Sequence, residues 1–271
     1  MSFADLLRVA PGTRPDLAAV DPAGTPGFEG GKKEARERVH DLRKELADFQ
    51  ERLWAESKAS LLVVLQALDA GGKDGTIRNV ISAFNPQGTR VTSFGVPTEE
   101  ELRHDFLWRI HAATPGRGRI GVFNRSQYED VLVVRVMELA PPAVWRGRYE
   151  QINDFEAGLA ANGTRILKFY LDVSREEQKK RLVKRLTKPE KHWKWSSGDL
   201  ETRNRWDEYR EAYTDALARC STDVAPWFII PADRKWYRDL AVAEILAETA
   251  REMNPQWPPA EEDLTGIVVP D

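Results

Sequence analysis

The sequence has little cysteine and histidine, and it contains no long apolar run. Its 271 residues include one cysteine, Cys220, which excludes an internal disulfide and fits a reducing cytoplasm. No run of about 18 apolar residues is present, so we expect neither a membrane span nor, from the composition of the first residues, a signal peptide. The four histidines have no metal-ligand spacing, and no Ser/His/Asp nucleophile arrangement is present.

The chain also lacks a strong charge of either sign. A formal net charge of −3 excludes a global polycation, so a polyanion would need a local concentration of positive charge. Such a concentration exists between Arg175 and Lys194. The length suits one large α/β domain with extensions. We expect an extended arm over residues 1–31, a domain over 32–253 and a proline-containing tail over 254–271 that lies on the surface.

Strand and helix patterns alternate along the domain. Apolar runs predict strands at 60–68, 90–94, 119–124, 165–173 and 226–230. Helical spacing predicts helices at 33–56, 75–83, 98–111, 128–138, 145–161, from a Ser174/Glu177 capping box to 186, around 206–217, and at 236–253. This alternation predicts a mainly parallel five-stranded sheet with helices on both faces, and a ligand site beyond the carboxyl ends of the strands.

The most informative stretch is glycine-rich and lies between the first strand and the next helix. Backbone N–H groups of such a turn and of a helix start can cradle phosphates, while Lys73 can reach the transferable groups. The match to the usual phosphate loop is imperfect because Ala67 replaces the first glycine and Asp74 the hydroxyl residue. The alternative is an ordinary turn with a solvated lysine. The candidate phosphate-binding residues here are Ala70, Gly71, Gly72, Lys73, Asp74, Gly75 and Arg78.

Two carboxylates flank this loop. Asp69 and Asp74 would repel a polyphosphate unless a hard cation lay between them, which predicts bound Mg²⁺.

A second candidate site follows the strand at 119–124. Asn124 is a neutral ligand or water-positioning group, and Arg125 can neutralise phosphate charge in a transition state. An ordinary strand-to-helix turn with an exposed arginine is the alternative.

The third candidate site is basic and contains tryptophan. Trp193 and Trp195 alternate with lysines, and residues 196–198 supply a flexible break, so the segment at about 181–203 can form a lid over phosphates. A solvated helix face, or base stacking in a nucleic-acid complex, are the alternatives. The candidate polyphosphate-binding residues are Arg125, Arg181, Lys184, Arg185, Lys188, Lys191 and Lys194.

Together these segments resemble the type-two polyphosphate kinases, which have a three-layer α/β/α phosphate-loop kinase fold with a helical lid. The resemblance extends from about Gly30 to Met253. It rests on ordered matches at 69–75, 85–88, 97–101, 123–126 and 191–194.

The resemblance implies reversible, Mg²⁺-dependent phosphoryl transfer between inorganic polyphosphate and nucleotides in a cytoplasmic homo-oligomer, a dimer or tetramer. By motif position, Asp69 binds the metal and Lys73 the phosphates, whereas Asn124 replaces the aspartate of most members. Asparagine there, with Glu129 downstream as the selectivity residue, resembles the third class, which converts AMP to ADP and then ATP and is expected to use guanine nucleotides. Asp74 is then the expected second metal ligand.

Two rival functions remain open at this point. An ATP-dependent kinase for nucleotides or another small acceptor would share the loop and the lid. A module that binds nucleic acid through residues 188–194 would show salt-sensitive oligonucleotide binding, although the net charge disfavours nucleic acid, and we expect no membrane partner either.

Overall fold

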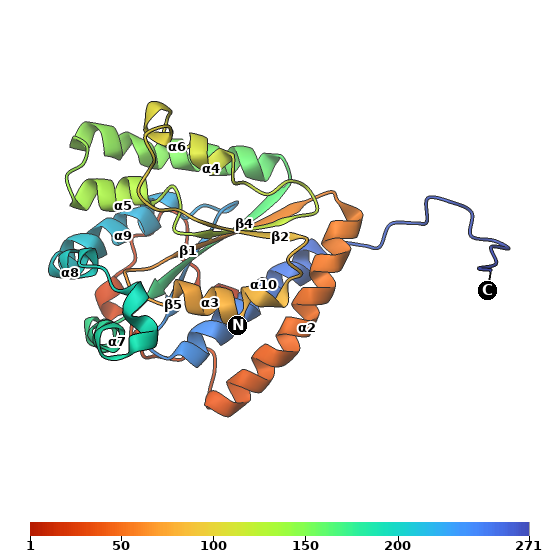
Figure 1. Cartoon of the computed structure of the whole chain (residues 1–271), viewed down its shortest axis with the longest axis horizontal. Coiled ribbons are helices and arrows are strands. Elements are labelled where there is room, and N and C mark those ends of the chain that lie inside the picture. Colours follow the sequence, from red (N-terminus) through yellow and green to blue (C-terminus); the bar gives the residue numbers. More distant parts are fainter. Residues whose placement is uncertain (271) are drawn as a thin grey trace.

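A five-stranded parallel sheet forms the centre of the computed structural model, which describes residues 1–270 (Figure 1). The strand order is β2-β3-β1-β4-β5, and each neighbouring pair runs parallel. The predicted sheet is therefore confirmed. The strands are β1 (Ser60–Gln66), β2 (Thr89–Ser93), β3 (Ile120–Asn124), β4 (Thr164–Asp172) and β5 (Trp227–Pro231).

Helices cover both faces of the sheet, which makes three layers (Figure 1). Along β1, Val63 and Leu65 join the core on one face, while Leu62 and Val64 join the core on the other. This two-sided burial explains the continuous apolar run of β1. One face carries α1 (Phe3–Leu7), α2 (Lys32–Glu56), α3 (Lys73–Asn79) and α10 (Lys235–Met253), and the other carries α4 (Trp108–His111), α5 (Glu129–Val136), α6 (Pro142–Ala161) and α9 (Trp206–Cys220).

The strand order brings three segments that each follow a strand to the same edge of the sheet, the edge formed by the carboxyl ends of the strands. β1 lies between β3 and β4, and Leu65 pairs in register with Asn124 on one side and with Phe169 on the other. The segments after β1, β3 and β4 therefore meet, at the point in the sheet where ligands bind in open α/β folds.

The lid segment lies beside this edge. It consists of α7 (Arg175–Thr187), the 3-10 helix η4 (Pro189–Lys194) and α8 (Gly198–Asn204), with α7 and α8 close together in Figure 1. The capping box predicted for α7 is only half formed. Ser174 Oγ accepts from the Glu177 N–H, but the Glu177 carboxylate accepts from Arg181 instead of returning to the cap.

Both ends of the chain differ from their expected descriptions. The N-terminal arm contains α1 and a 3-10 turn, η1 (Leu17–Ala19), and Arg8 forms an antiparallel bridge with Phe228 of β5. After α10, Pro255 and Gln256 contact α2, and the chain up to residue 270 then extends away from the body of the protein instead of lying on it (Figure 1). Within the described part of the chain, no helix combines the length and the hydropathy needed to cross a membrane.

The helix predicted over 98–111 is wrong. The segment forms two short pieces, η3 (Glu101–Arg103) and α4, because local polar groups satisfy the backbone between them. Thr98 and Glu101 exchange hydrogen bonds around a single turn, and the Asp105 carboxylate accepts from the Leu107 N–H. The helix predicted over 75–83 begins earlier, at Lys73, and continues as a separate 3-10 turn, η2 (Ile81–Ala83).

Candidate active site

The glycine-rich segment forms a tight turn between β1 and α3. Ala70 has a φ of 59° and Gly72 a φ of 124°, so the chain reverses within three residues. A side chain at Gly72 would be strained at this φ and would collide with the Arg238 guanidinium. The turn delivers the first N–H groups of α3, which have no intrahelical acceptor, to the sheet edge.

Lys73 is held inside this turn. It is 91% buried, and its Nζ donates to the Ala67 carbonyl at 2.8 Å, so the residue in place of the first glycine supplies a backbone contact. Burial and the nearby Arg125 charge lower the pKa of Lys73 to about 8. Few interactions compensate the Lys73 ammonium for its burial, so a phosphate that binds beside it would stabilise its charge.

Arg125 faces the loop from the end of β3. It adopts a φ of 64°, and its N–H donates to the Leu65 carbonyl, which ties this turn to β1. Its guanidinium donates to Asp69 at 2.7 Å and lies 3.9 Å from Glu129. The Glu129 charge, followed by that of Asp69, outweighs burial and raises the pKa of Arg125. The arginine is thus permanently charged at the loop.

Asp74 lies where the loop, β3 and the lid meet. Its carboxylate accepts from Lys194 Nζ of the lid at 2.6 Å and from Asn124 Nδ2 at 3.2 Å. Burial works to raise the pKa of Asp74, but the bond and charge of Lys194, with the Asn124 bond, outweigh it and lower the pKa. Asp74 is therefore an ionised carboxylate paired with Lys194, and Asp69 is paired with Arg125.

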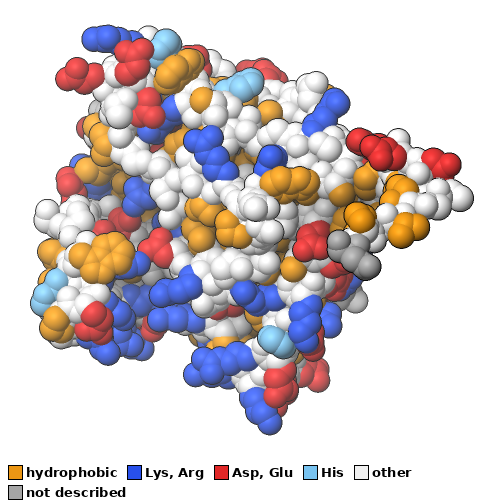
Figure 2. Space-filling view, turned by 45° about the vertical axis from the view of Figure 1, so that its right-hand side comes forward, with side chains coloured by type: hydrophobic (Ala, Val, Ile, Leu, Met, Phe, Trp, Pro, Cys, Tyr) orange, Lys and Arg blue, Asp and Glu red, His pale blue; other side chains and the backbone are white. Residues whose placement is uncertain are grey.

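These groups line one cavity of about 690 Å³. Ten Lys and Arg side chains line it, against four Asp and Glu side chains. On the face drawn in Figure 2, Lys and Arg side chains are more frequent in the lower half of the view than in the upper half. The positive charge that is absent from the chain as a whole is therefore concentrated here. The predicted residues that line this cavity are Asp69, Ala70, Gly71, Gly72, Lys73, Asp74, Gly75, Arg78, Asn124, Arg125, Arg181, Lys184, Arg185, Lys191 and Lys194.

Three predicted residues are placed differently from the rest. Lys188 does not line the cavity, and Glu129 lies behind Arg125. Arg181 borders the cavity, but its five N–H groups donate to the Glu177 carboxylate and to the backbone carbonyls of Ala70, Gly71, Ala232 and Asp233. It braces the loop and has no donor left for a ligand.

The structure adds residues that the sequence reasoning missed. Lys235 and Arg238 reach the cavity from the start of α10, directly after β5, so the rule that parallel strands end at one edge was the available signal. Asp199 also borders the cavity and pairs with Arg185. The other additions are Asn79 and Glu190, and Trp193 of the predicted lid also borders the cavity.

Cys220 lies outside this site. It is fully buried at the end of α9, and burial raises the pKa of its thiol to about 12, so the thiolate required of a nucleophile does not form near neutral pH.

The sheet, the loop and the cationic cavity define a phosphate-loop protein that holds polyanionic phosphates. Residues 29–258 match the family model described as Polyphosphate kinase 2 (PPK2), and the chain belongs to this family.

Known proteins similar to this chain cover nearly all of it. It is 52% identical to the AMP/ADP-polyphosphate phosphotransferase of Meiothermus ruber, over 97% of this chain and 98% of that protein. It is 43% identical to the ADP-polyphosphate phosphotransferase of Rhodopseudomonas palustris, over 93% and 91%. The crystal structure of Polyphosphate Kinase 2 from Arthrobacter aurescens TC1 superposes with a TM-score of 0.94 at 46% identity, over 97% and 94%.

Proposed function

We propose that this protein transfers the terminal phosphoryl group of inorganic polyphosphate, reversibly, to AMP and ADP. Family membership supports a polyphosphate-dependent nucleotide phosphotransferase. The choice of acceptors follows the Meiothermus ruber relative, whose name includes both AMP and ADP, while the name of the Rhodopseudomonas palustris relative includes ADP alone.

The observation that carries the proposal is the charge of the cavity. Ten cationic side chains are more than one nucleotide requires, but a polyphosphate repeats its charge at every phosphorus. An elongated polyanion therefore uses the lid cations Lys184, Lys191 and Lys194 as well as the loop.

The reacting phosphates would lie against the loop. Phosphoryl transfer has a loose transition state, so alignment and charge neutralisation provide most of the catalysis. Lys73 and the N–H groups of the loop would hold the phosphates on either side of the breaking bond, and Arg125 would turn from Asp69 to the transferred group. The acceptor is already an anionic phosphate, so no strong general base is required, in agreement with a cavity that no histidine lines.

The residues present fit Mg²⁺. Asp69 and Asp74 both border the cavity and offer carboxyl oxygens, and Mg²⁺ is usually bound by one or two carboxylates together with substrate phosphates and water. Within residues 1–270 no cluster of three or more His, Cys, Asp or Glu side chains could hold a metal alone, which agrees with such a shared site. Bound there, Mg²⁺ would neutralise phosphate charge and orient the phosphates. Asn124 orients Asp74 through a hydrogen bond that its side-chain amide donates, and it takes the place of the usual aspartate.

Glu129 is our candidate for acceptor choice. It lies 3.9 Å from Arg125, so its carboxylate influences how far Arg125 extends towards a mono- or diphosphate acceptor. We also predict that the protein uses guanine nucleotides, assembles as a dimer or tetramer and is located in the cytoplasm.

The first experiment incubates the purified protein with Mg²⁺, long-chain polyphosphate and AMP, and resolves AMP, ADP and ATP over time. ADP followed by ATP is the expected result. A parallel reaction started from ADP separates direct phosphorylation of ADP from disproportionation to AMP and ATP. ADP formed from AMP, with no ATP formed in the reaction started from ADP, would restrict the enzyme to AMP.

A donor comparison tests the two rivals. Turnover with ATP and a small acceptor, but none with polyphosphate, would replace the proposal by an ATP-dependent kinase. Salt-sensitive binding of a single-stranded oligonucleotide, without binding of polyphosphate, would favour a nucleic-acid module.

A further inference from the structure

The turn that carries Arg125 continues into a buried polar segment. Arg125 has a left-handed φ, which a non-glycine residue keeps only where its surroundings impose it. The next three residues, Ser126, Gln127 and Tyr128, are fully buried, and all three carry polar side chains. Ser126 Oγ accepts from Gln66 Nε2 of β1 at 3.2 Å, so the first of them is held by the central strand.

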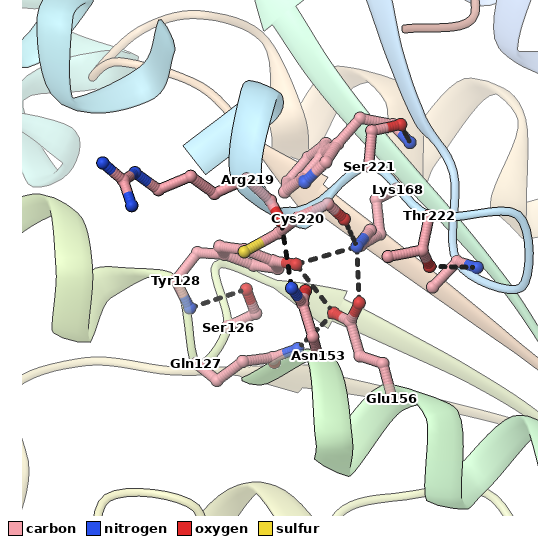
Figure 3. Close-up of polar contacts among 12 residues, drawn as sticks. Ser126, Gln127, Tyr128, Asn153, Glu156, Lys168, Arg219, Cys220, Ser221 and Thr222 are labelled. Carbon is pink, nitrogen blue, oxygen red and sulfur yellow. Dashed lines mark hydrogen bonds and ion pairs between the residues drawn. The ribbon is translucent and has the colours of Figure 1, made fainter. Parts of the chain in front are cut away.

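The other two side chains converge on one carboxylate of α6. Gln127 Nε2 and the Tyr128 hydroxyl each donate to Glu156 Oε1 at 2.9 Å (Figure 3). Glu156 is 1% exposed, and burial raises the pKa of its carboxyl although Lys168 opposes this effect. The turn is thus anchored to a carboxylate that is buried in the core.

Lys168 of β4 completes the cluster. It is fully buried, and its Nζ donates to Glu156 Oε2 at 2.5 Å, to the Tyr128 hydroxyl at 2.8 Å and to the Cys220 carbonyl at 2.6 Å (Figure 3). These contacts connect β4, α6 and the end of α9 to one turn. Packed apolar side chains often stabilise a core as well as a buried ion pair does, so stability alone does not account for this pair.

None of the residues in this cluster borders the cavity, yet Gln127 lies two residues from Arg125. We propose that the buried pair Glu156–Lys168 positions Arg125, by fixing Gln127 and Tyr128 and so the backbone of the turn. The pair consists of positioning residues and does not touch substrate. The inference rests on the proposed contact between Arg125 and the transferred phosphate.

The test cuts the connection between the turn and the pair. Gln127→Met removes the bond to Glu156, and it also removes an amide oxygen that has no partner among the described residues. We expect kcat for ADP formation from polyphosphate and AMP to fall at least tenfold while both KM values change less than threefold. Tyr128→Phe, which deletes one hydroxyl, should lower kcat in the same direction and provides the test if the methionine variant does not fold.

The pair itself is tested by Lys168→Met combined with Glu156→Gln, which leaves no buried unpaired charge. This variant should also lower kcat. Ser60→Ala is the matched control: it breaks the buried Ser60–Thr164 hydrogen bond of 2.9 Å at the opposite ends of β1 and β4, and it should leave kcat unchanged.

Repeating Gln127→Met in an Arg125→Ala background separates positioning from mere stability. If the cluster acts through Arg125, Gln127→Met has less than a twofold effect there, because the positioned group is absent. The same fold loss in both backgrounds, or a kcat of Gln127→Met within twofold of wild type, would overturn the inference. A wild-type kcat for Arg125→Ala itself would instead refute the proposed role of Arg125.

Discussion

The cavity has two walls of different construction. One, the sheet wall, consists of the loop 69–75 and the turn 124–129; the other, the lid wall, consists of residues 184–194. On the sheet wall, Lys73 and Arg125 are tied to β1 through the Ala67 and Leu65 carbonyls. On the lid wall, Lys184 is exposed, and Lys194 reaches the sheet wall through one ion pair with Asp74.

The difference matches two tasks. Transfer of a phosphoryl group depends on atoms placed to within a fraction of an ångström, which groups held against the central strand provide. Retention of a polymer with evenly repeated charge needs positive potential more than exact geometry, and exposed or half-buried lysines of α7 and η4 supply it. We therefore expect substitutions on the sheet wall to change kcat, and substitutions on the lid wall to change the apparent affinity for polyphosphate.

The largest effect should follow removal of Lys73. Lys73→Ala is expected to lower kcat at least about a hundredfold, a barrier increase of about 2.7 kcal/mol, because no other ammonium lies inside the loop. Initial rates with saturating substrates and an unchanged melting curve check this. Activity within about tenfold of wild type, about 1.4 kcal/mol, would refute the role of Lys73.

The pH dependence should identify the same residue. Lys73 binds phosphate only when protonated, and its pKa is about 8, so kcat/KM should fall as the pH rises through about 8. Bound phosphates favour the ammonium, so kcat should fall only at higher pH. Lys73→Arg stays charged, and its residual activity should lack the fall near pH 8. An identical alkaline limb in this variant would assign the titration to another group.

Glu129 should have a smaller effect, on selectivity. Glu129→Gln removes the charge beside Arg125 and is expected to change the ratio of the AMP and ADP phosphorylation rates about threefold to tenfold, roughly 1 kcal/mol. Separate initial rates with each acceptor give the ratio. Glu190→Gln, which removes a carboxylate from the lid wall, is the control and should leave the ratio constant. An unchanged ratio in Glu129→Gln would contradict our assignment.

The smallest effect should come from single lid lysines. Lys191→Ala is expected to raise the KM for long-chain polyphosphate about twofold to fivefold with little change in kcat. The increase in KM should be smaller at high salt, because salt screens the lost charge. Lys188→Ala is the matched control, because Lys188 lies on the same segment but does not line the cavity. Equal effects of the two substitutions would mean that the lid acts through its overall charge.

Several elements were predictable because their signals are local. The apolar run of β1 and the helical stripe of α9, with Trp206, Tyr209, Tyr213 and Leu217 buried on one side, appear where the periodicity indicated. The segment 98–111 was not predictable in the same way. Its helical spacing competes with the side chains of Thr98 and Asp105, which bond to nearby backbone groups and stop each turn.

The basic helix shows the limit of reading residue types alone. Arg181 and Arg185 look equivalent in the sequence. In the structure, however, Arg181 donates to backbone carbonyls of the loop and of the segment after β5, while Arg185 pairs with Asp199. The carbonyl partners of Arg181 lie 51 to 111 residues away along the chain, so spacing within α7 could not separate a bracing residue from a phosphate contact.

The sequence by itself determined the alternation of strands and helices, the phosphate loop with Lys73, and the local excess of positive charge, because each depends on residues that are neighbours in the chain. Only the tertiary structure decided which groups meet. It placed Arg238 and Lys235 beside the loop, paired Asp74 with Lys194, and buried Glu156 against Lys168 beneath the turn of Arg125. Those encounters follow from the parallel strand order, which brings distant segments to one edge and leaves no local trace in the chain.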